Sequence, residues 1–185
     1  MKVLLSTPDV TPLGRRARRR ARRKLAELDA LGARLAELAR IRDLAEAARQ
    51  VVAAGWVQDA WYVRPDARRV DLAQARRMGQ VPVERACLVG AILHAGGGVA
   101  SADTQLVQRT FDLTWHTIHR RPQEPVHWCP APPIRAQQLR DLVQWNDRAD
   151  RTGADVEALL HSVEQAAVRE VENGRSRLAA FTGRE

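Results

Sequence analysis

The stretch LAELDALGARLAELARIRDLAEAARQVVAA, residues 25–54, carries apolar side chains at three- and four-residue steps. That spacing places them on one face of an α-helix. The positions on this face are Leu25, Leu28, Leu31, Leu35, Leu38, Ile41, Leu44, Ala48 and Val51. Ala17 and Ala21 continue the face toward the N-terminus. We therefore predict one long helix from about Arg15 to Ala54, stopped by Gly55.

Several shorter elements are predicted after this helix. Residues 56–80 lose the helical period, which predicts a short hairpin or an irregular segment. Helices are expected over VERACLVGAILHA, over TQLVQRTFDLTWHTIHRR after a capping Ser101, and over residues 134–147. A last helix begins after Thr152, whose spacing to Asp155 is typical of a capping box. The expected fold class is mainly α, a compact helical domain of about five helices preceded by a long basic N-terminal helix.

The net charge of +8 is concentrated in one segment of the chain. Residues 15–24, RRARRRARRK, carry eight basic side chains, while residues 25–185 hold 21 basic and 21 acidic ones. The eight are Arg15, Arg16, Arg18, Arg19, Arg20, Arg22, Arg23 and Lys24. We expect a cluster this dense to bind phosphates strongly at low salt and nearly independently of sequence. We therefore predict a basic arm, residues 1–24, on a neutral single helical domain, residues 25–185.

Helix formation in the arm is electrostatically unfavourable in the absence of a partner. Positive side chains lie beside the partial positive charge of the helix N-terminus, and like charges three and four residues apart repel one another. We expect the arm to be mobile when free and to become ordered beside an anion.

The favoured function is a non-enzymatic accessory protein that associates with DNA, RNA or the ribosome through the phosphate backbone. An alternative is a module for protein–protein interaction, self-association or structural assembly, which would use the Leu-rich helix over residues 25–51. An acidic protein is a further possible partner for the arm.

Composition argues against membrane and secreted classes. No apolar run approaches the roughly 20 residues that a bilayer crossing requires. The opening MKVLLSTPDV is too short in apolar residues for a secretory signal. Two cysteines, Cys87 and Cys129, do not make a disulfide framework. We therefore expect a cytoplasmic protein without a membrane partner.

One pattern suggests a thiol enzyme as a further alternative. Cys87 lies near the predicted start of a helix, where the helix dipole lowers a thiol pKa. His116 or His119 would be its base, and Asn146 or Asp147 would orient that base. The competing interpretation of Cys87 is a small buried residue in a tightly packed helix, and this is the interpretation we favour.

A second pattern suggests a metal site. His116 and His119 are three residues apart on a predicted helix, and His127 and Cys129 follow in a Pro-rich loop. These spacings match no standard zinc pattern. We therefore predict no metal and no cofactor. Trp128, between His127 and Cys129, is the tryptophan most suited to an exposed position.

Three short segments resemble a family of unknown function from high-GC Gram-positive bacteria and their phages. The segments are GWVQDAWYV, RACLVGAILHAGG and WNDRADRTGADVEALL, and the resemblance spans about residues 44–166. The matching positions are Trp56, Cys87, Gly90, Ala91, Asn146, Asp147 and Thr152. The resemblance implies a fold and no chemistry. Asn146 and Asp147 are therefore either catalytic or, as we favour, side chains that cap a helix end and hold the following loop.

Overall fold

The computed structural model describes residues 14–71, 74, 75, 77 and 82–182, and it confirms a mainly helical fold. The N-terminal part of the predicted arm, residues 1–13, lies outside the described residues. In chain order the described elements are α1 (Arg15–Ala54), β1 (Tyr62–Val63), β2 (Arg69–Val70), β3 (Arg85–Ala86), α3 (Leu88–Ala95), the 3-10 helix η1 (Val99–Ser101), α4 (Gln105–His119), α5 (Pro132–Asn146) and α6 (Gly153–Thr182).

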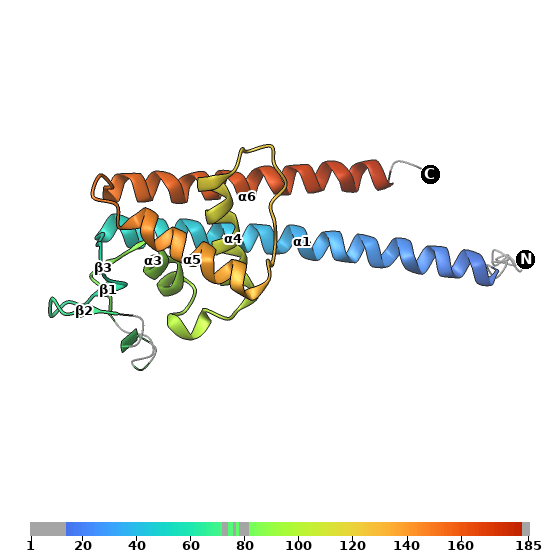
Figure 1. Ribbon diagram of the computed structural model, residues 1–185. Helices are drawn as coiled ribbons and strands as arrows, with labels where there is room; N and C mark the ends of the chain where they lie inside the picture. The colour runs from blue at the N-terminus through green and yellow to red at the C-terminus, as the bar shows by residue number, and fades with distance from the viewer. Residues whose placement is uncertain (1–13, 72–73, 76, 78–81, 183–185) are drawn as a thin grey trace, which may run out of the picture.

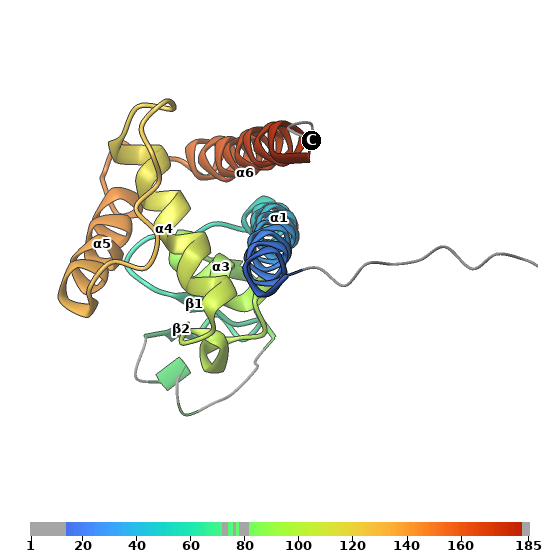
Figure 2. The same cartoon turned by 90° about the vertical axis from the view of Figure 1, so that its right-hand side faces the viewer.

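Two long helices form the scaffold of the domain. α1 and α6 run side by side in opposite directions (Figure 1), and α4 packs against both of them. α5 packs against α3 and α4 on the side away from the α1–α6 pair (Figure 2). Within the described residues, no helix has the length and apolar content needed to cross a membrane.

The predicted bounds of α1 are confirmed, but only its second half lies in the core. Leu38, Ile41 and Leu44 are buried, as are Ala48 and Val52 one and two turns further on. The first turns of α1 extend past the end of α6 and away from the domain (Figure 1). Leu25, on the same apolar face, is 59% exposed. The helical period therefore predicted the helix correctly, but it did not show where the packing partner of the helix ends.

A three-stranded antiparallel sheet occupies one end of the domain. β1 lies between β2 and β3, and Tyr62 pairs with Val70 on one side and Ala86 on the other. This confirms the predicted hairpin. α3 packs directly onto the chain entering β1, because a Cβ added at Gly90 would lie 2.1 Å from the Trp61 carbonyl oxygen. Only glycine permits this approach.

Side-chain caps explain where α6 and α4 begin. The capping box of α6 is confirmed: Asp155 N donates to Thr152 Oγ1 at 3.3 Å and Thr152 N donates to Asp155 Oδ2 at 2.9 Å. The prediction that Ser101 caps the next helix is wrong. Ser101 lies in η1 and donates to the Gly98 carbonyl, and Thr104 caps α4 instead.

Candidate functional site

The basic arm forms the first turns of α1. Gly14 precedes the helix without a side-chain cap, and the first turn holds no acidic residue. Arg15 to Arg23 are all exposed, whereas Lys24 is partly buried. Free N–H groups at the helix start therefore add their partial positive charge to that of the guanidinium groups. Whether the arm is mobile when free stays a prediction.

The arginines of the arm cover more than half of the helix circumference. At 3.6 residues per turn, the seven positions from Arg15 to Arg23 spread over roughly 200° of the circumference and, with Lys24, about 14 Å of axis. Ala17 and Ala21 occupy the remaining face. The charge thus forms a broad band around the helix rather than a single stripe. We call this band, formed by the basic residues between Arg15 and Lys24, the collar.

The ion pairs found among the described residues involve arginines outside the arm. Glu37 accepts from Arg34 and Arg109, and Glu164 accepts from Arg49 at 2.8 Å. Among the described residues, no ion pair involves any of the seven arginines between residues 15 and 23. The protein's own acidic groups therefore do not neutralise the guanidinium part of the collar.

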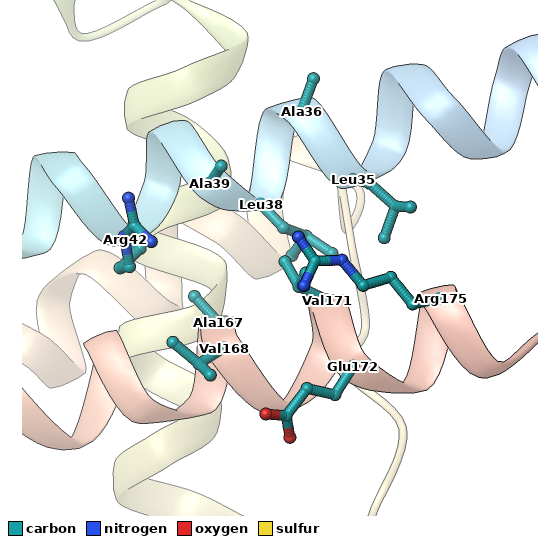
Figure 3. A pocket seen from close by; sticks show the side chains of 10 residues that line it. All are labelled: Leu35, Ala36, Leu38, Ala39, Arg42, Ala167, Val168, Val171, Glu172 and Arg175. Carbon is teal, nitrogen blue, oxygen red and sulfur yellow. The ribbon is translucent and has the colours of Figure 1, made fainter.

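α6 packs against α1 beyond the C-terminal end of the arm. The two helices approach closely at Gly174, where an added Cβ would lie 2.6 Å from Leu35 Cδ2. Beside this contact the helices leave a groove of about 370 Å³. Figure 3 shows Leu38 and Val171 in the seam and the guanidinium group of Arg175 reaching back over it. α1, which carries the collar, is thus packed against α6 at Leu31 and Leu35, beyond the arm.

A buried network connects α1 to α4. Glu37 is 6% exposed, and its Oε1 accepts from Gln105 Nε2 at 2.8 Å while its Oε2 accepts from Arg34 and Arg109. Arg34 also lies over the Trp128 ring, 3.9 Å from its centroid. Trp128, predicted as the exposed tryptophan, is therefore partly buried beneath a cation.

Cys129, in the loop before α5, lies against the same side of α4. Arg109 Nε donates to Cys129 Sγ at 3.5 Å, and Cys129 N donates to the buried carboxylate of Asp112 at 2.8 Å. Asp112 also accepts from Arg135 of α5 at 3.1 Å. The guanidinium group of Arg109 lowers the pKa of the Cys129 thiol. Cys129 is exposed and has a positive φ of 55°.

Cys87 has the opposite environment. It is 3% exposed at the N-cap of α3, where its Sγ accepts from Gly90 N at 3.3 Å. Burial raises the pKa of its thiol to about 12. His116 faces a separate hollow next to Arg120 and Glu170. These features favour the structural interpretation of Cys87 over the nucleophilic one.

Asn146 and Asp147 join three parts of the chain. Asn146 is fully buried, and its Oδ1 accepts from Trp56 Nε1 and from Leu88 N, both at 3.0 Å. Its Nδ2 donates to the Val57 carbonyl at 3.2 Å and to Asp147 Oδ1 at 2.7 Å. All four hydrogen bonds of the amide are made to other groups of the protein, as expected of a side chain that holds a helix end and its neighbouring loops.

The histidines that were considered as metal ligands differ in environment. His116 is buried, and burial lowers its pKa. His119 is exposed and stacks on the Trp115 ring at a centroid distance of 4.8 Å. Among the described residues, no group of three or more His, Cys, Asp or Glu side chains is placed to hold a metal ion.

The sequence reasoning missed Arg109, Asp112, Arg135 and Gln138. Arg109 and Asp112 are three residues apart on α4, and Arg135 and Gln138 are three residues apart on α5, so the spacing marks each pair only as one helix face. Nothing local indicates that α4 and α5 bring the two pairs together.

The chain belongs to a family of unknown function, DUF6197, whose model matches residues 36–166. The match begins inside α1, close to the point where that helix enters the core, and it leaves out the whole basic arm. No curated protein and no solved structure matches the chain.

Proposed function

We propose that this protein is a non-enzymatic accessory protein that binds nucleic acid through the guanidinium collar of α1. The proposal places the contacts on Arg15, Arg16, Arg18, Arg19, Arg20, Arg22, Arg23 and Lys24, with the phosphate backbone as ligand. The observation that carries it is a set of seven exposed arginines for which the described structure supplies no carboxylate. The proposal places the protein in the cytoplasm.

The shape of the arm supports duplex DNA as the partner. A helix with its side chains is about 10–12 Å across, which fits a major groove about 12 Å wide. Arginines spread over roughly 200° reach phosphates on both walls of that groove. The major groove of duplex RNA is too narrow for a helix. Between residues 15 and 24 the arm holds only Arg, Lys and Ala. We expect its cations to contact mainly phosphates, so binding is expected to be nearly independent of sequence.

The family match supports a division of roles. The matched segment, residues 36–166, contains the buried networks and the core, while the arm precedes it. We infer that the arm supplies affinity for a polyanion and that the family domain supplies the fixed base from which the arm projects.

Two variants of equal charge test the proposal. Arg16, Arg19 and Arg23 replaced together by Gln remove three phosphate contacts, because they lie on one side of the collar. At 0.15 M salt this weakens duplex binding on the order of 100-fold, since each contact contributes a slope near 0.9. The control replaces Arg40, Arg69 and Arg121, which are exposed on the domain, by Gln. Fluorescence anisotropy with a labelled duplex measures both variants. Equal weakening by the two variants would refute a specific role for the arm.

Self-association is the second candidate function, supported by Leu25. Among the residues that the structure describes, this side chain is one of two exposed large apolar ones, and it lies on the apolar face of α1 beyond the core. A concentration-dependent mass in light scattering that nuclease treatment leaves unchanged would favour self-association. A mass that falls to the monomer value after nuclease treatment would favour nucleic-acid binding.

A further inference from the structure

A stripe of apolar and small residues runs along the outer face of α1. Its positions, which follow one another in steps of four and three residues, are Ala21, Leu25, Leu28, Gly32, Leu35 and Ala39. At 3.6 residues per turn, these positions fall within a stripe about 80° wide. Alternating steps of four and three are the heptad spacing by which two helices pack along each other. We call these six residues the outer stripe.

Most of the outer stripe is open to solvent. Leu25 is 59% exposed, and Ala21 and Gly32 are exposed as well. α6 meets the stripe at its edge, where Leu35 lies against Gly174. No described helix or strand lies against the side of α1 that faces away from α3 and α4 (Figure 2). Because apolar side chains at heptad spacing are normally buried by another helix, this exposed stripe marks a surface for one.

The outer stripe continues into the groove between α1 and α6. Leu35, Ala36 and Ala39 line this groove from α1, and Val168 lines it from α6. Ala36 and Ala39 lie along α1 at the edge of the groove (Figure 3). Their short side chains, like the absence of a side chain at Gly32, let the axis of a second helix come close to α1. The surface therefore fits the side of another helix.

The two ends of the outer stripe carry opposite charge. Arg18 and Arg22 flank its N-terminal end, Asp43 and Glu46 follow its C-terminal end, and all four are exposed. Gly32 is midway between Arg18 and Glu46. An antiparallel second copy centred near Gly32 therefore brings the arginines of each chain beside the carboxylates of the other. A parallel copy would place the two collars side by side, where like charges repel.

We propose that the outer stripe is a homodimer interface, on which α1 of a second copy of this chain packs antiparallel and centred near Gly32. The apolar residues of the stripe supply the contact, and the charge pairs at its two ends set the direction. This inference rests on self-association, the second candidate function, and not on nucleic-acid binding. Arg16, Arg19 and Arg23 lie on the opposite side of the helix, where the dimer leaves them open to a duplex.

The mass of the nuclease-treated, full-length protein tests the interface. Sedimentation equilibrium between micromolar and millimolar concentration should show a monomer–dimer equilibrium. Leu25→Gln should weaken the dimer at least about tenfold, because each dimer buries two copies of this leucine. Ile134→Gln is the matched control: Ile134, on α5, is 53% exposed, and its replacement should leave the equilibrium unchanged. A protein that stays monomeric, or a Leu25→Gln variant that dimerises like the parent, would overturn the proposal.

Disulfide cross-linking tests the direction. The background variant is Cys129→Ser, which removes the exposed native thiol and leaves the buried Cys87. In the antiparallel dimer, chains with Ala21→Cys should cross-link to chains with Asp43→Cys but not to one another, because a disulfide needs Cα atoms within about 7 Å. Cross-linking of Ala21→Cys chains to one another, or no cross-link in the mixture, would overturn the proposal. Both experiments exclude nucleic acid, so a failure of duplex binding would leave their results unchanged.

Discussion

Replacing Asn146 by Ala tests whether this residue is structural or chemical. The substitution removes four hydrogen bonds at once, two accepted by Oδ1 and two donated by Nδ2. It leaves the backbone N–H of Leu88 and the carbonyl of Val57 without their side-chain partner. Each buried group that loses its partner costs about 1–3 kcal/mol. Because water reaches the partly buried Trp56, we expect a total loss of about 3–5 kcal/mol in the free energy of unfolding.

Urea unfolding followed by tryptophan fluorescence and by circular dichroism measures this loss. The control is Gln144→Ala, an exposed position on the same helix, which should change the free energy of unfolding by less than about 0.5 kcal/mol. A domain of this size has roughly 5–15 kcal/mol of stability in total, so the expected loss is readily measured. A loss below about 1 kcal/mol for Asn146→Ala would refute the structural interpretation and return Asn146 to the list of catalytic candidates.

Two further predictions concern glycines and thiols. Gly32→Ala should stabilise the protein by about 0.5–1 kcal/mol, because an added Cβ meets nothing within 4 Å. Gly90→Ala should destabilise it by about 3 kcal/mol or more, because the added Cβ would clash with the Trp61 carbonyl. Thermal unfolding measures both effects, and equal effects would contradict the packing described for α3. Cys129 should react with iodoacetamide at least about 100-fold faster than Cys87 at pH 7, because it is exposed and its thiol pKa is lowered, while the pKa of Cys87 is about 12. The labelling rate of Cys129 should rise at a lower pH than that of an ordinary thiol, and Arg109→Leu should move this rise to higher pH. Mass spectrometry of the labelled peptides measures the rates. An unchanged pH profile in Arg109→Leu would exclude Arg109 as the cause of the lowered thiol pKa.

The sequence predicted features that depend on neighbours along the chain. α1 follows the three- and four-residue spacing of its apolar side chains, and the start of α6 follows from Thr152 and Asp155. The cap of α4 was misplaced because Ser101 and Thr104 are both good capping residues. The choice between them depends on the 3-10 turn at residues 99–101, which has no strong local signal.

The candidate sites were harder to predict wherever they depend on residues far apart in the sequence. Cys129 has a lowered thiol pKa because α4 presents Arg109 to a loop 20 residues later. Gln138 is a plain polar residue in the sequence, and only the packing of α5 against α3 and α4 buries it. The arm was the opposite case, because its charge density is visible in ten consecutive residues. Its exposure followed from the absence of a packing partner, which only the structure could show.

The salt dependence of duplex binding tests the central proposal most directly. If the intact protein contacts six to eight phosphates as proposed, the slope of log K against log salt should be roughly −5 to −7. Replacing all eight basic residues between Arg15 and Lys24 by Gln should reduce the slope to near zero and abolish binding at 0.15 M salt. A substituted protein that binds as tightly as the parent, with the same slope, would show that the collar is not the nucleic-acid interface.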